Sequence, residues 1–177
     1  TVLDLQNPAE PMFYVNGTLD ANGAVFQTVM QRGDSLVNVR NNGTANLTDC
    51  VFDVSTDSSW TGADGSLVYA YNDAVVNVSG GTYQSGIFRT ERSGYTHWVH
   101  QQTNGFRTTG NAELNIGSSG RGRTVVDAVY YGVNHASPVA LEIDGADFSG
   151  VYRAFTIGTI GNVFLFNVGI DSCTTGI

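Results

Sequence analysis

The stretches SLVNVRNNGTANLTDCVFD (residues 35–53) and SLVYAYNDAVVNVSGGTYQ (residues 66–84) decide the fold, because they align without a gap at an offset of 31 residues. The aligned pairs are Ser35 with Ser66, Leu36 with Leu67, Val37 with Val68, Asn46 with Asn77, Leu47 with Val78 and Phe52 with Tyr83. A repeat of this length indicates one structural unit that stacks on its neighbours.

Three more copies follow, aligned on Phe106, Val133 and Phe155 at offsets of 38, 27 and 22 residues. Each copy has one apolar residue on each side of a variable position. Because alternate side chains of a strand point to opposite faces, the apolar pair points inward and the middle residue outward. One predicted inward column is Leu47, Val78, Ile116, Ile143 and Leu165, with Leu114, Leu141 and Val163 beside it, and another is Val37, Val68, Phe106, Val133 and Phe155. Asn46, Asn77 and Asn115 would either stack outward or line a bend where their amides hydrogen-bond along the ladder.

These columns predict an all-β fold, a parallel β-helix of about five to six rungs. A β-propeller blade needs about 40 residues per repeat, and the shortest offset here is 22. A leucine-rich repeat would require a leucine framework and a helix in each copy. A β-sandwich stays open as the alternative, although it does not explain the alignment of the copies.

With its 22-residue minimum repeat, its apolar-x-apolar columns and the phrase NVGIDSCTTGI (residues 167–177), the chain resembles the pectin-lyase-like right-handed β-helices. That superfamily includes pectate lyases, alginate-modifying enzymes and bacteriophage tailspikes, and the chain resembles the tailspike or virion-spike type. The resemblance implies a right-handed coil. Residues 1–34 would form an N-terminal cap with leading strands, and residues 35–177 the β-helix. The β-helix is expected either to continue beyond residue 177 or to be capped there by another chain.

The charge balance bounds the partners. Sixteen acidic residues face eight basic ones, all arginine, which gives a net charge of -8. Such a surface repels phosphate backbones and argues against nucleic acid as a partner. The sequence contains no apolar run of about 18 residues that would span a membrane. An extracellular or virion-surface protein is expected.

Insertions between rungs are expected at residues 55–65, 85–105 and 117–130, all after the same strand of the rung and therefore on one side of the coil. Inserted loops on one face often form the binding surface of a repeat protein. Aromatic rings beside arginine are typical of carbohydrate sites. The predicted substrate-binding residues are Trp60, Arg89, Arg92, Tyr95, His97, Trp98 and His100. The arginine pair in this loop is the expected holder of an anionic sugar.

Glycosidic hydrolysis uses two carboxyl groups. The predicted catalytic pair is Glu91 with Asp127, and Asp64 is the alternative partner of Glu91. A lyase would instead use a base such as Tyr95 or His97. No fixed catalytic phrase of the pectate lyases or alginate epimerases is present, so no catalytic residue is carried over from them. Whether the protein is an enzyme stays open at this point.

No metal site and no cofactor are expected, because the three histidines and two cysteines lack the spacing of a ligand set. Cys50 lies in the first predicted rung and Cys173 after the fifth. About four rungs separate them, roughly 20 Å, which exceeds the reach of a disulfide. Both thiols are expected to be free.

Two functions follow from these features. In the first, the module binds, and in its enzymatic form cleaves, a surface polysaccharide. In the second, it is a non-catalytic virion decoration, spike or adhesin protein whose loops contact other subunits. A homo-oligomer, for example a trimer, or a larger assembly is expected in either case.

Overall fold

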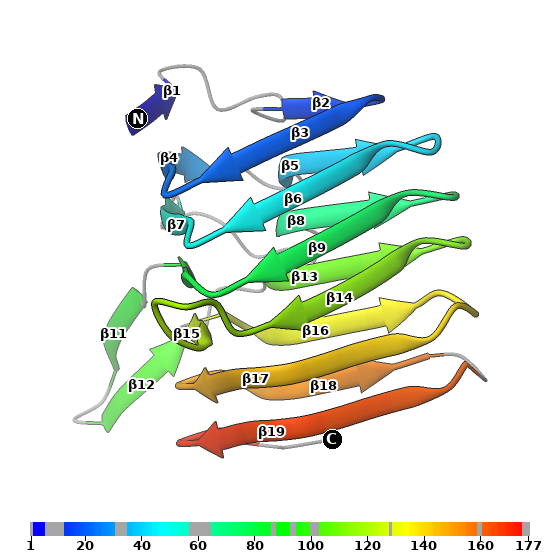
Figure 1. Ribbon diagram of the computed structural model, residues 1–177. Helices are drawn as coiled ribbons and strands as arrows, with labels where there is room; N and C mark the ends of the chain where they lie inside the picture. Colours follow the sequence, from blue (N-terminus) through cyan, green and yellow to red (C-terminus); the bar gives the residue numbers. More distant parts are fainter. Residues whose placement is uncertain are drawn as a thin grey trace.

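The computed structural model of the chain is all-β, built from two parallel sheets and one hairpin (Figure 1). The structure describes residues 2–5, 13–30, 35–56, 65–85, 88–92, 95–99, 103–127, 129–158 and 161–174. Over these ranges no residue is helical. Accordingly, this part of the chain has no helix that is long and apolar enough to cross a membrane.

One sheet has six strands, which pair in parallel throughout. In chain order its strands are β2 (Phe13–Val15), β5 (Ser35–Arg40), β8 (Ser66–Tyr71), β13 (Asn104–Thr109), β16 (Tyr131–Ala136) and β18 (Arg153–Ile157). Each strand pairs with the next in this order, so successive copies of the repeat lie side by side.

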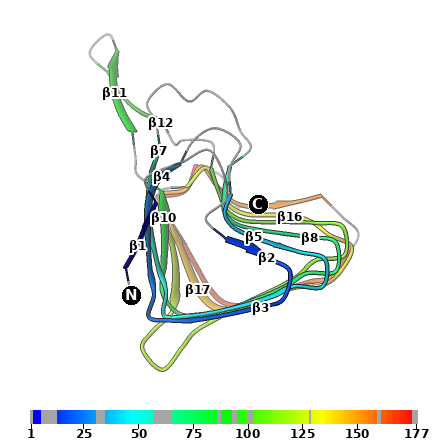
Figure 2. The same cartoon turned by 90° about the horizontal axis from the view of Figure 1, so that it is seen from above.

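The other sheet has eleven strands in two halves, also parallel. The first half contains β3 (Thr18–Asn22), β6 (Thr44–Thr48), β9 (Val75–Ser79) and β14 (Glu113–Gly117). The second half contains β1 (Val2–Leu5), β4 (Val25–Met30), β7 (Val51–Thr56), β10 (Thr82–Ser85) and β15 (Thr124–Asp127). The nine-residue strands β17 (Leu141–Ser149) and β19 (Val163–Asp171) are long enough to run through both halves. Seen from above, the strands superpose in three groups around a common interior (Figure 2).

A tight turn divides the two halves in the copies before β17. Asp49 has a φ of 51° and Gly80 a φ of 68°, both in the left-handed region, which aspartate and glycine tolerate better than most residues. A Cβ on Gly80 would lie 2.5 Å from Ser119 Oγ and 2.6 Å from Asp49 Oδ1. This close approach and the positive φ both require glycine at the turn.

The register of the strands confirms the predicted alignment of the repeat copies. In the six-stranded sheet the Cα partners follow the order Val37, Val68, Phe106, Val133 and Phe155. In the other sheet they follow Leu47, Val78, Ile116, Ile143 and Leu165. The sequence therefore predicted both the strand partners and the parallel pairing.

Burial agrees with these columns except in the last strand. Leu47, Val78, Leu114, Ile116, Leu141 and Ile143 are buried, as are the five residues of the other column. The prediction that Val163 and Leu165 are buried is wrong, because each is 37% exposed. Both lie on β19, which among the described strands pairs only with β17, so no further strand covers them.

The core lies between the two sheets and is held by aromatic stacking as well as aliphatic columns. The rings of Phe26 and Phe52 stack with centroids 4.4 Å apart, and those of Phe52 and Tyr83 at 4.8 Å. Tyr83 in turn contacts Phe106 of the six-stranded sheet at 4.8 Å. Such ring pairs add to the free energy of burial, so the stack links neighbouring copies of the repeat and both sheets.

The N-terminal residues 13–30 form a further copy that the alignment did not include. β2 pairs with β5, β3 with β6 and β4 with β7, each in parallel. This copy occupies the same three strand positions as the later ones. The sequence alone predicts a cap with leading strands in residues 1–34.

Two of the three predicted insertions follow equivalent strands of the repeat, and the third does not. Residues 57–64 follow β7 in the chain, and residues 86–102 follow β10. The strands β7 and β10 pair with each other. Residues 124–127, by contrast, form β15, which pairs with β10 as a regular strand of the repeat. The prediction of three loops on one side is therefore wrong for residues 117–130, where only the turn before β15 is inserted. That turn projects at a different corner from the hairpin (Figure 2).

The prediction of free thiols is confirmed. Cys50 is buried and Cys173 half-buried, and neither is in a disulfide. They lie in different copies of the repeat, Cys50 directly before β7 and Cys173 after β19.

Candidate functional site

The outer face of the six-stranded sheet carries arginine and tyrosine side chains. In β5, β8 and β13 the strand ends alternate between buried residues and residues that reach the surface. This alternation is the ordinary consequence of strand geometry. We call the surface the arginine–tyrosine face, and it consists of Tyr14, Arg40, Tyr69, Tyr71, Arg107, Tyr131 and Arg153.

Each arginine of this face lies over a tyrosine ring. The guanidinium carbon of Arg40 is 4.1 Å from the centroid of the Tyr14 ring. The corresponding distance is 5.2 Å from Arg107 to Tyr69 and 5.9 Å from Arg153 to Tyr131. Cation–π attraction favours this arrangement, so the face combines flat aromatic surface with planar cations.

Hydrogen bonds hold these side chains in place. Arg40 donates from Nε to Asn16 Oδ1 at 3.1 Å and from Nη1 to the Tyr71 hydroxyl at 3.5 Å. The Tyr69 hydroxyl and Thr109 Oγ1 are 2.9 Å apart. The rings of Tyr69 and Tyr71 lie 5.2 Å apart. These contacts reduce the conformational freedom of the side chains before any ligand arrives, which lowers the entropic cost of binding.

The charge of the face is opposite to that of the whole chain. The six strands contain three arginines and neither aspartate nor glutamate, whereas the protein has a net charge of -8. The strand order places Arg40, Arg107 and Arg153 on every second strand. The register displaces them along the strands, so they form a diagonal row across the sheet.

A tyrosine cluster borders this face at the corner that follows β15 and β17. Tyr130 stacks on Tyr152 with centroids 4.5 Å apart and contacts Tyr131 edge-on at 4.6 Å. Burial raises the pKa of the Tyr130 phenol, and the neighbouring tyrosines raise it further. Tyr130 follows β15 and Tyr152 follows β17, at the strand position that β7 and β10 occupy in earlier copies.

The predicted loop residues are only partly described. Trp60 and His100 lie outside the described residues. The others lie on β11 (Phe88–Arg92) and β12 (Tyr95–Val99), an antiparallel hairpin that projects from the stacked strands (Figures 1 and 2). The register opposes Arg89 to Trp98, Thr90 to His97 and Arg92 to Tyr95. Opposed positions belong to one face of a hairpin and neighbouring positions to opposite faces. The strand positions therefore divide the predicted cluster between two faces.

The predicted catalytic carboxylates lie on different elements. Glu91 is on β11, where it is opposite Thr96. Asp127 is on β15, paired with Gln84 and Ser149, so it belongs to a strand rather than to a loop. The structure does not describe the Glu91 side chain, so this pair stays a prediction.

The residues of the arginine–tyrosine face were missed in the sequence. The signal was present, because Arg40 and Tyr71 end the aligned strands SLVNVR and SLVYAY at outward positions.

Across the described ranges no three histidine, cysteine or acidic residues form a metal site. No family model, curated protein or solved structure matches this chain.

Proposed function

We propose that the fold is a right-handed parallel β-helix of the pectin-lyase-like type. The support is the parallel pairing of strands at three positions, each repeated in register along the chain. A connection between parallel strands of one sheet is right-handed in nearly all proteins, because the strands themselves twist in one direction. Equivalent side chains then form rows along the coil.

We propose further that the arginine–tyrosine face binds an anionic polysaccharide, outside the cell or on the surface of a virion. The observation that carries this proposal is the set of three arginines, each stacked on a tyrosine, on a sheet without carboxylates. A guanidinium group matches a carboxylate with two parallel hydrogen bonds. Tyrosine rings offer apolar surface for the faces of sugar rings. The row of arginines suits a polymer that carries acidic groups at intervals.

The remaining surface supports the same assignment. An acidic protein repels an anionic polymer over most of its area, so the local positive face directs the polymer to one place. The strands that precede the two longer insertions, β7 and β10, are followed in the chain by β8 and by β11–β13, and β8 and β13 belong to this face. The hairpin residues predicted to bind sugar would extend the same site. The expected homo-oligomer stays a prediction.

The test is a titration with a galacturonate oligosaccharide, measured by calorimetry. Arg107→Ala is expected to raise the dissociation constant about tenfold or more, since a hydrogen bond to a charged group contributes about 1.5–3 kcal/mol. Arg121→Ala is the matched control, because it removes the same charge from a side chain that is 75% exposed in another region. It should change the dissociation constant by less than about twofold.

Two outcomes would contradict the proposal. One is equal weakening by both substitutions, which would indicate a nonspecific effect of net charge. The other is the absence of binding to galacturonate and to other carboxylated or sulfated oligosaccharides. Thermal melting of each variant separates lost binding from lost folding. If the bound polymer is also cleaved by the predicted pair, Glu91→Gln abolishes the release of reducing ends and leaves the affinity unchanged.

A further inference from the structure

The outer face of the first half of the eleven-stranded sheet carries a continuous ladder of side-chain amides. Asn115 donates from Nδ2 to Asn77 Oδ1 at 2.9 Å, and Asn77 donates to Asn46 at the same distance. Asn46 then donates to Asp20 Oδ1 at 2.7 Å. The four residues lie on β14, β9, β6 and β3, so the ladder crosses four strands in one direction.

The ladder forms the floor of a surface groove of about 550 Å³. We call it the amide groove. Besides the three asparagines, Glu113, Glu142 and Asp144 line it. It is open to solvent and runs across the strands, parallel to the direction in which the copies of the repeat stack.

The ladder leaves hydrogen-bonding capacity that faces the groove. A side-chain amide has two N–H groups and a carbonyl oxygen with two lone pairs. Asn46 and Asn77 each use one N–H in the ladder, and the second remains for a ligand. Asn115 uses both, the second on Glu113 Oε1 at 2.8 Å, so its carbonyl oxygen remains. Neighbouring strands lie about 4.8 Å apart. Donors and acceptors therefore repeat at short, regular intervals along the groove.

Two exposed phenylalanines border the groove on β19. Phe164 is paired with Glu142 and Phe166 with Asp144. The two rings are 43% and 53% exposed. Their outward direction follows from strand alternation, since Val163 and Leu165 continue the inward columns. The outward direction of both rings therefore follows from the register with β17 alone.

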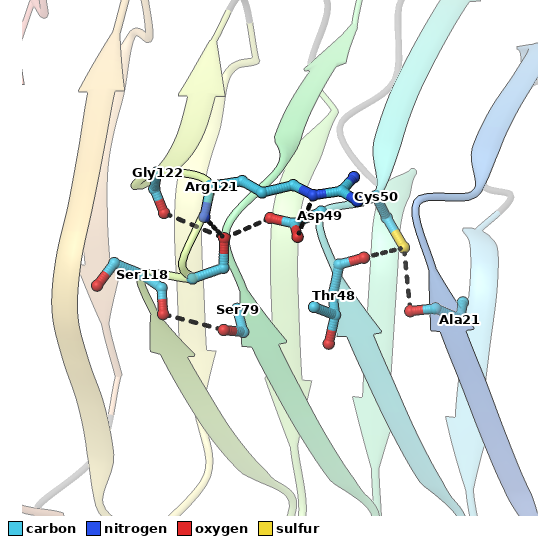
Figure 3. A network of polar contacts seen from close by, with 9 residues as sticks. Ala21, Thr48, Asp49, Cys50, Ser79, Ser118, Arg121 and Gly122 are labelled. Atoms are coloured by element: carbon cyan, nitrogen blue, oxygen red, sulfur yellow. Dashed lines mark hydrogen bonds and ion pairs between the residues drawn. The ribbon is translucent and has the colours of Figure 1, made fainter.

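A network of polar contacts holds the turn of residues 118–122 (Figure 3), which follows the lining residue Gly117. Ser79, a lining residue, donates from Oγ to the Ser118 carbonyl at 2.9 Å. In the same turn the Ser119 hydroxyl donates to Asp49 Oδ1 and accepts from the Arg121 backbone N–H at 3.0 Å. The Arg121 guanidinium lies 3.6 Å from Asp49. These contacts join three copies of the repeat beside the groove, which reduces the conformational freedom of the turn and lowers the entropic cost of binding next to it.

The charge of the groove selects among ligands. Its lining contains three carboxylates and no arginine. The nearby Arg123 is engaged elsewhere, since its Nε donates to Asp147 Oδ2 at 2.7 Å. An anionic ligand would be repelled by these carboxylates. A hydroxyl group both donates and accepts, which matches the mixed amide and carboxylate lining.

We propose that the amide groove is a second carbohydrate site, selective for a neutral glycan. The amide ladder binds the hydroxyl groups, and Phe164 and Phe166 pack against the apolar face of a sugar ring. The site lies on a different sheet from the arginine–tyrosine face and prefers the opposite ligand charge. It does not depend on the function proposed for that face.

The experiment titrates the whole chain with soluble neutral glucan and mannan oligosaccharides and with a galacturonate oligosaccharide. Binding is followed by saturation-transfer NMR and calorimetry. At least one neutral oligosaccharide should bind. Phe166→Ala should weaken that binding about tenfold, about 1.4 kcal/mol, without lowering the melting temperature, because the ring is exposed. Asn77→Ala should weaken it as well, through the lost amide.

Tyr14→Ala is the matched control, since Tyr14 is an aromatic residue with a similar exposure of 48% on the other sheet. It should leave the affinity for the neutral glycan unchanged and weaken galacturonate binding, because Tyr14 lies under Arg40 in the arginine–tyrosine face. The proposal is overturned if no neutral oligosaccharide binds, or if Phe166→Ala and Asn77→Ala leave the affinity unchanged in a folded protein. It is also overturned if Tyr14→Ala weakens neutral binding as much as Phe166→Ala. Phe166→Ala and Asn77→Ala should leave galacturonate binding unchanged, because both residues lie on the other sheet, so the two proposals fail separately.

Discussion

The two outer faces of this protein have the same backbone plan and opposite chemistry. The six-stranded sheet presents three arginines and no carboxylate. β3, β6, β9, β14, β17 and β19 contain six carboxylates and no arginine. One face is built on cation–π pairs and the other on an amide ladder. In both, a residue type that recurs at one outward strand position becomes a row across the sheet.

The difference shows how a repeat fold separates stability from recognition. The inward columns are apolar in both sheets, since burial of apolar surface stabilises the stack. The outward positions make a smaller contribution to stability and are therefore free to differ. Because equivalent outward residues stack on each other, each face can acquire its own charge without changing the core.

The largest expected effect concerns the core that both faces share. Leu141→Ala removes a fully buried side chain of β17 and should lower the free energy of unfolding by about 2–5 kcal/mol. Leu165→Ala removes the same atoms from β19, where Leu165 is 37% exposed, and should cost less than about half as much. Urea denaturation followed by circular dichroism measures both. Equal costs would show that β19 is covered in solution.

The inward columns could be predicted because they depend only on local alternation and on the repeat. Leu47 and Val78 align in the sequence, and they are partners in the sheet. The outward faces depend on the register of several strands together. Arg107 lies over Tyr69, 38 positions earlier in the chain, and neither residue marks the contact by itself. The core could therefore be predicted from the sequence more readily than either candidate site.

The misplaced third insertion has a similar physical origin. Residues 124–127, TVVD, form a strand only because they pair with β10 on one side and β17 on the other. The segment is four residues long and follows the turn of residues 118–123, so its own pattern is too short to indicate a strand. By contrast, the insertions after β7 and β10 were correctly located, because the flanking copies align.

A smaller effect is expected from salt, which should change the ligand affinities of the two faces to different extents. Raising the ionic strength from about 0.01 to 1 M shortens the screening length from about 30 to 3 Å. Binding of galacturonate at the arginine–tyrosine face should weaken about tenfold or more over this range. Binding of a neutral glycan in the amide groove should change by less than about twofold, since no ligand charge is involved. Calorimetric titrations at several salt concentrations measure both. Parallel salt dependence would remove the electrostatic distinction between the faces.

The pH dependence of stability tests the layer beneath the arginine–tyrosine face. His135 is buried in β16, with Nε2 2.9 Å from the Val139 carbonyl and Nδ1 2.7 Å from Thr108 Oγ1. A carbonyl only accepts, so Nε2 carries the proton and Nδ1 accepts from Thr108. Burial lowers the pKa of His135 below its usual value of 6.5. The unfolded chain therefore binds a proton more readily than the folded one.

The sign of the effect follows from this difference. Above the usual histidine pKa of 6.5 both states are neutral, and the stability does not depend on this group. As the pH falls below 6.5, the unfolded state becomes protonated first and the free energy of unfolding decreases. His135→Gln should flatten the profile between about pH 7 and 5 relative to the unsubstituted protein. Urea denaturation at several pH values measures the difference, and parallel profiles would contradict the assignment.

The smallest expected effect is a difference in the labelling rates of the two cysteines, which does not involve a change in stability. Cys50 lies in the corner between the two halves of the eleven-stranded sheet, with Sγ 3.4 Å from the Ala21 carbonyl and 3.5 Å from that of Thr48. Cys173 follows the outermost described strand and is half-buried. Burial raises the pKa of both thiols, so little of the reactive thiolate is present at neutral pH.

Iodoacetamide should therefore label Cys173 slowly and Cys50 more slowly still, because the Cys50 side chain is inaccessible. Mass spectrometry with and without urea measures the two rates, and urea should make them equal. Fast labelling of Cys50 in the folded protein would mean that the corner opens, and with it the turn beside the amide groove that Asp49 and Ser119 hold in place.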